Sequence, residues 1–347
     1  MEIETQLFHT ILSAIRPGLS KKEIVQEATN FIFTGTHLAT FNDQISISYP
    51  FETSFKCSVR AEDLYKIITG ISAEKIKLEV EDNQLLISGG RTKAGLVVSM
   101  EGKIASLIEE LDKERHDWNN VPTDFLTGAK LCMFCTSRDA TSGVYTCIKV
   151  EETEIIGTDS YRASWYQMNG MLSHNPLFLP AKSVASLIGT EVKKYALGQS
   201  WIHFQSANGV LFSMRTMTGE FRDVKPIFEV EEEGTRAILP KELGEALTDT
   251  LVLSDEESIF DKTSDIKIGD NQIVCEVKKE RGWIKKSVDV KYKKTPVEFS
   301  VNPIWLSEVL NYTTSVTIYP VKHLAVFQSG NFKHLLMFKI TKVENAE

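Results

Sequence analysis

The sequence predicts an α+β fold made of three tandem copies of one unit, in which two helices pack on antiparallel sheet. In each copy a helix is followed by three alternating strand-like runs, and this order fills the 347 residues. Phe204-Gln205-Ser206 and Phe327-Gln328-Ser329 are identical tripeptides at equivalent places, with Leu86-Ile87-Ser88 as their counterpart in the first copy. The three serines are 118 and 123 residues apart, which sets the length of the repeat.

The first copy contains an amphipathic helix over 59–68, with Leu64, Ile67 and Ile68 on its apolar face. Strands are predicted at 75–80, at 84–88 and, after Gly89-Gly90, at 96–100.

The second and third copies repeat this order. The second has a helix over 179–188, with Pro180 near its start, and strands at 195–197, 201–206 and 210–214. The third has a helix over 304–311 and strands at 316–319, 324–329 and 335–340.

Each copy also begins with a helix, which we expect at 4–15, 124–136 and 240–251. Alternating strands follow at 31–33 with 44–49, at 146–150, and at 265–268 with 273–277. The charged, turn-rich stretches 109–120 and 229–234 are predicted to be links between domains. The predicted domains are therefore 1–115, 121–230 and 235–342, followed by a short tail, 343–347.

The polar stretch from Gly157 to Ala163 follows the strand-like Glu154-Ile155-Ile156 and is short enough to connect two strands of one sheet. Taken alone, it reads as a surface turn satisfied by Thr158 and Asp159. Loops on rigid sheets also tend to hold binding residues, so it is a candidate site.

Composition places the chain among ordinary globular proteins, with 42% hydrophobic and 25% charged residues. No apolar run approaches the roughly 20 residues that span a bilayer, and the acidic N-terminus does not resemble a signal peptide, so we expect a cytoplasmic protein. Its five scattered cysteines suit a reducing compartment, and Cys132 and Cys135 are predicted core residues because no second pair completes a zinc site.

Motifs of catalysis are absent from the sequence. It has no phosphate loop of the G-x-x-x-x-G-K-[ST] kind, no G-x-S-x-G and no H-E-x-x-H, and its seven histidines have no metal-ligand spacing. We therefore predict no enzymatic activity, no metal site and no cofactor. A nuclease with scattered carboxylates stays open as an alternative.

A net charge of −8 argues against nucleic-acid binding over the whole surface but allows a local basic face. Basic residues lie at or near several predicted helices, where they could hold a phosphate backbone without reading sequence. They are Arg16, Lys21, Lys22, Arg60, Lys66, Lys130, Arg138, Lys182, Lys193, Lys194 and Lys241.

Four stretches, in order along this repeat, resemble the bacterial DNA polymerase III β subunit, the sliding clamp. The stretch 158–162, Thr-Asp-Ser-Tyr-Arg, resembles the family's Thr-Asp-Gly-His-Arg, and 219–223, Gly-Glu-Phe-Arg-Asp, resembles its Gly-Arg-Phe-Pro-Asp. The stretch 179–182, Leu-Pro-Ala-Lys, matches the start of the family's second-domain helix, and the apolar 335–340 resembles its C-terminal end.

The resemblance implies a head-to-tail homodimer that forms a ring of six domains around duplex DNA and tethers DNA polymerase to it. It also implies an ATP-driven clamp loader, because this chain has no nucleotide site. Arg138 and Lys182 match basic DNA-facing positions of the family, and Lys21 or Lys22 falls near another. With Arg60, Lys66 and Lys193 these form the predicted DNA-facing set.

The family's partner pocket binds short peptides rich in Gln, Leu and Phe between the second and third domains. The resemblance implies an apolar floor from Ile227, Leu336 and Met337 and a polar rim from Thr158 and Arg162. The full implied set is Thr158, Tyr161, Arg162, Ala163, Arg222, Pro226, Ile227, Leu335, Leu336, Met337 and Phe338. Because Ser160-Tyr161 replaces Gly-His and Ala163 replaces a larger aliphatic residue, we expect a shifted peptide preference. The extension 341–347 could cover the pocket.

In the family, basic residues after the first domain's glycine turn pair with third-domain acids across the dimer interface. Arg91 and Lys93 match the basic side, but the matching third-domain stretch, 277–286, is itself mostly basic. We therefore expect those ion pairs to be missing or rearranged, with apolar contact through Val252 and Leu253.

The sequence thus predicts a replication processivity clamp that acts on nucleoid DNA in the cytoplasm. The alternative is a repeat-built, peptide-binding scaffold that does not encircle DNA.

Overall fold

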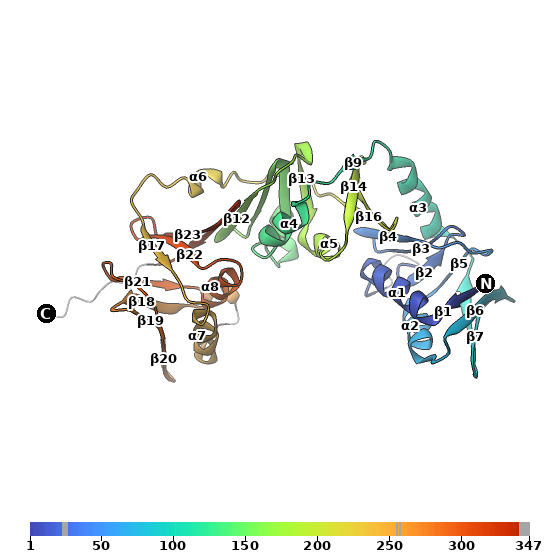
Figure 1. Cartoon of the computed structure of the whole chain (residues 1–347), viewed down its shortest axis with the longest axis horizontal. Helices are drawn as coiled ribbons and strands as arrows, with labels where there is room; N and C mark the ends of the chain where they lie inside the picture. The colour runs from blue at the N-terminus through green and yellow to red at the C-terminus, as the bar shows by residue number, and fades with distance from the viewer. Residues whose placement is uncertain (23–26, 101, 255, 257, 340–347) are drawn as a thin grey trace. The chain divides into compact units, whose positions relative to one another are not determined.

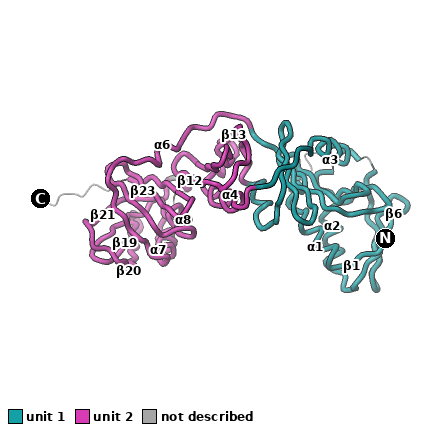
Figure 2. Tube along the Cα trace, turned by 45° about the horizontal axis from the view of Figure 1, so that its top comes forward, with its two compact units in different colours: residues 1–121, 182–217 teal, residues 122–181, 218–347 magenta. Residues whose placement is uncertain are grey.

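The computed structural model describes residues 1–22, 27–100, 102–254, 256 and 258–339. The α+β class is confirmed: helices pack on antiparallel sheets throughout the described chain. The chain divides into two compact units, 1–121 with 182–217 and 122–181 with 218–347 (Figure 2). The predicted second domain, 121–230, therefore contributes strands to both units.

The first unit is built on a twelve-stranded antiparallel sheet (Figure 1). In sheet order its strands are β1 (Glu2–Glu4), β6 (Lys75–Glu81), β7 (Gln84–Gly89), β8 (Thr92–Ser99), β5 (Cys57–Arg60), β2 (Asn30–Phe33), β3 (His37–Phe41), β4 (Ile45–Pro50), β16 (Leu211–Arg215), β15 (Trp201–Ser206), β14 (Val192–Leu197) and β9 (Asn119–Asn120).

Two neighbouring helices, α1 (Thr5–Ile15) and α2 (Ala61–Gly70), cover one face of this sheet (Figure 1). Phe8, Ile11, Leu12 and Ile15 recur at helical spacing on α1 and are all buried, so the apolar stripe predicted from the sequence is the face that packs. The short 3-10 turn η1 (Arg16–Gly18) ends α1.

The opposite face of the sheet is covered by α3 (Lys103–Glu114), and here the sequence prediction was wrong. The stretch 109–120 was expected to be a domain link, but its first half is helical. Ile104, Ile108 and Leu111 are buried against Ile32 and Trp201. Their helical spacing was hidden by the charged residues on the solvent face, which dominate the composition of the stretch.

Helix α5 (Ala181–Ala185) is also shorter than the predicted 179–188. After Ala185 the backbone tightens, because the N–H groups of Ser186, Leu187 and Ile188 each bond to the carbonyl three residues earlier. The second link, 229–234, contains no helix or strand, as predicted.

The second unit has an eight-stranded and a four-stranded antiparallel sheet. The first has the order β13 (Ser173–Pro180), β10 (Cys147–Glu152), β11 (Glu154–Thr158), β12 (Arg162–Gln167), β24 (Phe332–Met337), β23 (Leu324–Ser329), β22 (Ser315–Tyr319) and β17 (Thr235–Ile238). The second has the order β20 (Gly282–Asp289), β19 (Gln272–Lys279), β18 (Ser264–Gly269) and β21 (Val297–Val301).

The helices of the second unit are α4 (Phe125–Met133), α6 (Lys225–Phe228), α7 (Leu243–Thr250) and α8 (Pro303–Leu310), with 3-10 turns η2 (Ala140–Thr146), η3 (Leu251–Leu253) and η4 (Ile259–Asp261). Helix α8 starts where the side chain of Asn302 accepts the N–H groups of Ile304 and Trp305, with Pro303 in the first turn. It packs against α7 over the apolar core of the third repeat.

One kind of strand pairing joins neighbouring repeats in both units. In the first unit β4 pairs antiparallel with β16, the last strand of the second repeat. In the second unit β12, the equivalent of β4, pairs antiparallel with β24, the last strand of the third repeat. The third-repeat equivalent of β4 and β12 is β20, which is a sheet edge. The last strand of the first repeat, equivalent to β16 and β24, is β8, whose residues 92–97 pair only with β7.

A buried serine–histidine pair bridges adjacent strands in each unit. His203 Nδ1 lies 2.8 Å from Ser213 Oγ, and His334 Nδ1 lies 2.8 Å from Ser164 Oγ. Burial, with Arg115 nearby, lowers the pKa of His203 to about 3, and burial beside Arg162 lowers the pKa of His334 well below its usual value. Both histidines are therefore neutral in the folded protein at neutral pH.

These two histidines predict that stability falls in mild acid. Below the unfolded-state pKa of about 6.5, the unfolded chain binds protons at these histidines that the folded chain does not bind. Their contribution to the free energy of unfolding is therefore fully present well above that pH and is lost as the pH falls below it. Lowering the pH from 8 to 5.5 should reduce the free energy of unfolding by about 1.4 kcal/mol for each histidine. Urea unfolding of the wild type and of the double variant His203→Asn/His334→Asn measures this. Equal losses on acidification in both proteins would contradict the assignment.

Candidate functional site

The predicted loop 157–163 is the turn of the β11–β12 hairpin, and its own side chains hold it in shape. Thr158 Oγ1 donates to the carbonyl of Arg162 at 2.6 Å and accepts the N–H of Ser160, whose φ is 74°. Asp159 Oδ1 accepts the N–H groups of Tyr161 and Arg162, each at 3.1 Å. Gly157 is required because a Cβ there would collide with the carbonyl of Cys132 on α4.

Arg162 anchors this hairpin in the interior of the second unit. Its side chain is 3% exposed; Nε donates to Asp159 Oδ2 at 2.9 Å, and a second nitrogen donates to the carbonyl of Phe134 at 3.1 Å. The third nitrogen donates to Glu308 of α8, and the guanidinium lies over the ring of Trp305. All three nitrogens are therefore used within the protein.

Glu308 is shared between two arginines. One carboxylate oxygen accepts from Arg162, and the other accepts from Arg138 at 2.9 Å. The Arg138 side chain is 74% exposed, whereas that of Arg162 is buried. A single carboxylate thus connects the base of the hairpin to a predicted DNA-facing residue.

A pocket of about 320 Å³ opens beside the hairpin. It is lined by Tyr145, Thr158, Ser160, Tyr161, Arg162, Ala163, Arg222, Val224, Ile227, Leu335 and Met337. Eight of the eleven residues expected from the resemblance are among these. Tyr145, Ser160 and Val224 were missed: Tyr145 lies on η2 and Val224 just before α6, and neither stretch has a local signal for binding.

Three expected residues are absent from this lining: Pro226, Leu336 and Phe338. Leu336 and Phe338 alternate with Leu335 and Met337 along β24 and its continuation, so their side chains point to the other face. They pack into the core of the third repeat, where the ring of Phe338 lies 4.6 Å from that of Phe299. The expected floor of Ile227, Leu336 and Met337 is therefore corrected to Ala163, Val224 and Leu335, with Ile227 and Met337 exposed at the mouth.

The expected polar rim is also corrected. Thr158 and Arg162 are 2% and 3% exposed. Thr158 donates its hydrogen bond within the hairpin, and Arg162 donates to Glu308 of α8. The exposed groups at the mouth are Tyr161, Ser160 and Arg222. No carboxylate of the described residues lies within 4 Å of Arg222, so this guanidinium is available to a ligand.

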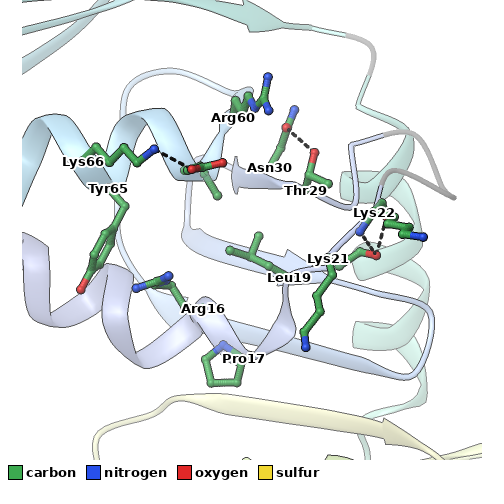
Figure 3. A pocket seen from close by; sticks show the side chains of 13 residues that line it. Arg16, Pro17, Leu19, Lys21, Lys22, Thr29, Asn30, Arg60, Tyr65 and Lys66 are labelled. Atoms are coloured by element: carbon green, nitrogen blue, oxygen red, sulfur yellow. Dashed lines mark hydrogen bonds and ion pairs between the residues drawn. The ribbon is translucent and has the colours of Figure 1, made fainter.

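The first unit contains a separate basic pocket, of about 970 Å³ (Figure 3). Four predicted DNA-facing residues, Lys21, Lys22, Arg60 and Lys66, line it together with Arg16. Lys66 bonds to Glu62 at 2.6 Å, and the guanidinium of Arg16 lies 4.1 Å from the centre of the Tyr65 ring. Within the described ranges no carboxylate lies within 4 Å of Arg16, Lys21 or Lys22, which leaves this pocket positive.

The other DNA-facing candidates lie outside this pocket. Lys182 is exposed on α5 and Lys193 is exposed on β14, both in the first unit. Arg138 belongs to the second unit and is engaged by Glu308.

The four predicted interface residues lie on or beside β8 and β20. Arg91 is in the β7–β8 turn and Lys93 is exposed on β8, while Val252 and Leu253 form part of η3, which lies against β19 and β20. Exposed apolar side chains lie on the same strands: Val97 is 77% exposed on β8, and Trp283 is 68% exposed on β20.

Acidic residues of the same unit neutralise part of the basic stretch 277–286. Lys286 bonds to Asp249 at 2.8 Å, and Lys279 bonds to Glu256. The bond from Lys279 lowers the pKa of Glu256 to about 2. Fewer free charges therefore face β20 than the sequence suggests.

Cys132 and Cys135 are confirmed as core residues. Both are fully buried, and burial raises the pKa of Cys135 to about 12, so neither thiol is reactive. Among the described residues no group of three His, Cys, Asp or Glu side chains could hold a metal ion. The described helices include none that is both long and apolar enough to cross a bilayer. The extension 341–347 lies outside the described residues.

No family model matches the sequence, and no curated protein matches it. Solved structures do match. The beta subunit of DNA polymerase from Streptococcus pyogenes aligns with a TM-score of 0.81 at 18% identity, over 98% of this chain and 99% of that one. The DNA polymerase III beta subunit from Thermotoga maritima aligns with a TM-score of 0.79 at 16% identity, again over 98% and 99%.

A sliding clamp, DNA polymerase III subunit beta, from Pseudomonas aeruginosa bound to griselimycin gives a TM-score of 0.79 at 15% identity, over 98% of this chain and 99% of that one. The likeness therefore extends over the whole length of all three structures. At these identities it shows the fold, which is the fold of the sliding clamps.

The two arginines on Glu308 give a matched test of the site. Arg162→Ala should lower the free energy of unfolding by about 3–5 kcal/mol, because it leaves the buried Asp159 without its cation and takes from Glu308 the buried one of its two arginines. Arg138→Ala removes an exposed partner of the same carboxylate and should cost less than about 1 kcal/mol. Urea unfolding of both variants decides this, and equal losses would contradict the anchoring role of Arg162.

Proposed function

We propose that this chain is a DNA sliding clamp, a replication processivity factor that encircles duplex DNA and catalyses no reaction. The observation that supports this most directly is the likeness to sliding clamps over 98% of the chain, including all three repeats. We propose 1–115, 121–230 and 235–342 as its three domains, and the cytoplasm, on nucleoid DNA, as its place of action.

The proposed ring closure is supported by the pairing that joins neighbouring repeats. β4 with β16 and β12 with β24 make two junctions of one kind. The counterparts of these strands that lack such a partner are β20, which is a sheet edge, and residues 92–97 of β8, which pair only with β7. Both carry exposed apolar side chains, and an edge of this kind can accept a strand of another chain. Pairing β20 of one copy with β8 of a second copy, twice, gives a head-to-tail ring of six repeats.

DNA would be held by charge alone. The basic pocket formed by Arg16, Lys21, Lys22, Arg60 and Lys66 offers cations without side chains arranged to read bases. Contacts to phosphate are independent of sequence, which allows a closed ring to slide. Lys182, Lys193 and Arg138 are proposed to add to this face, with Arg138 exchanging Glu308 for phosphate.

The pocket beside the β11–β12 hairpin is proposed to bind short apolar peptides of DNA polymerase and of the clamp loader. Its apolar floor and its mouth of Tyr161, Ile227 and Met337 suit leucine and phenylalanine side chains, and Arg222 suits an acidic group nearby. A methionine at the mouth can adapt to several partners.

Retention on DNA tests the function. The protein, incubated with a bacterial clamp loader and ATP, should stay on nicked circular plasmid in high salt and should be lost when the plasmid is linearised. Lys21→Glu/Lys22→Glu/Arg60→Glu should reduce loading several-fold, whereas Lys113→Glu on α3 should not. Equal retention on circular and linear DNA, or none on either, would point to the scaffold alternative, and metal-dependent plasmid cleavage to the nuclease.

The peptide pocket is tested through Met337, which is 49% exposed. Met337→Asp places a charge in the apolar mouth and should weaken binding of a fluorescent Gln/Leu/Phe-containing pentapeptide by at least tenfold, as measured by anisotropy. Met337→Leu, which keeps the apolar contact, should bind nearly as the wild type does. Unchanged affinity in the Asp variant would place the peptide elsewhere.

A further inference from the structure

A second basic pocket, of about 590 Å³, lies in the second unit beside strand β17. One wall is β17 with the residues that follow it, and the other is the segment after β20. The lining residues are Arg236, Ala237, Ile238, Leu239, Pro240, Asp289, Val290, Lys291, Tyr292, Lys293, Lys294 and Ser315. None of them belongs to the hairpin pocket or to the basic pocket of the first unit.

In the segment after β20, the residues that alternate with the lysines are packed in the core, so the lysine side chains point to solvent. Val290 and Tyr292 are 8% and 5% exposed and belong to the apolar core of the third repeat. Asn271 fixes both residues, because its carbonyl accepts the N–H of Val290 at 2.9 Å and its Oδ1 accepts the N–H of Tyr292. Alternation along this extended segment leaves Lys291 and Lys293 exposed.

Positive charge in this pocket is not neutralised. Four cations, Arg236, Lys291, Lys293 and Lys294, face one acid, Asp289. In the part of the chain that the structure describes, no carboxylate lies within 4 Å of any of the four. Lys294 Nζ donates to the carbonyl of Arg236 at 3.0 Å, which places its charge directly beside the strand.

Strand β17 offers a free backbone edge to the same pocket. It is the last strand of the eight-stranded sheet and pairs only with β22. The N–H of Leu239 donates to the carbonyl of Thr314, on the side of β22. Since successive N–H groups along a strand point to opposite sides, those of Arg236 and Ile238 point away from β22. The Ile238 side chain is 72% exposed, so an apolar contact is available beside these donors.

We propose that this pocket is a second docking site, for an extended acidic segment of a partner protein that pairs with β17. Backbone bonds to the free edge would give affinity, and acidic side chains facing Arg236, Lys291 and Lys293 would give selectivity. The observations favour a peptide over nucleic acid, because a phosphate backbone can accept from the outward N–H groups but lacks the alternating donors and acceptors that continue a strand, and it gains nothing from Ile238. The proposal holds whether or not the protein encircles DNA.

The probe is a fluorescein-labelled peptide of alternating glutamate and valine, with an alternating lysine–valine peptide as its control. The glutamate peptide should bind the full-length protein, and the lysine peptide should not. Lys291→Glu/Lys293→Glu should weaken binding at least tenfold, and each single substitution several-fold, whereas Lys113→Glu, a single charge reversal on α3, should leave it unchanged.

Ile238→Pro separates strand pairing from charge attraction. It removes an outward N–H without changing charge or a ladder bond, and it should weaken the peptide several-fold while the thermal unfolding midpoint stays near that of the wild type. Ile238→Ser, which retains the N–H, should have a smaller effect. The proposal is overturned if the glutamate peptide does not bind, if Ile238→Pro binds it as the wild type does, or if a single-stranded oligonucleotide of equal charge competes equally well.

Discussion

Antiparallel pairing between strands of neighbouring repeats is the constraint on which the rest of this structure depends. The pairings of β4 with β16 and of β12 with β24 turn separate helix-on-sheet units into continuous sheets. Each joins a strand from one repeat to the last strand of the next, so the same surfaces are used twice. An array of such repeats leaves one pairing position open at each end, at β20 and at residues 92–97 of β8.

The junction between β12 and β24 also creates the hairpin pocket. Ala163 of β12 and Leu335 of β24 are direct partners and form its floor. Arg162, one residue earlier on β12, then fixes the turn to α8 through Glu308. The pocket is therefore a product of the joined sheet, and neither repeat would form it alone.

Much of this could be predicted from the sequence, because the repeat is visible in hydrophobic periodicity and the hairpin in its polar turn. Leu336 and Phe338 were misplaced because a resemblance gives positions along a strand, whereas the face that each side chain occupies depends on pairing register. Tyr145 and Val224 reach the pocket from distant segments, so no local pattern marks them. Helix α3 was missed because its charged face dominates composition, although Ile104, Ile108 and Leu111 have helical spacing.

Head-to-tail closure through β8 and β20 is the central claim, and the mass of the protein in solution tests it most directly. Light scattering across a concentration series should give twice the chain mass of 39.1 kDa. Trp283→Asp, which places a charge on the exposed face of β20, should shift that mass toward a single chain at the same concentrations. A wild-type protein that stays a single chain at every concentration, or a Trp283→Asp variant that dimerises as the wild type does, would contradict the account.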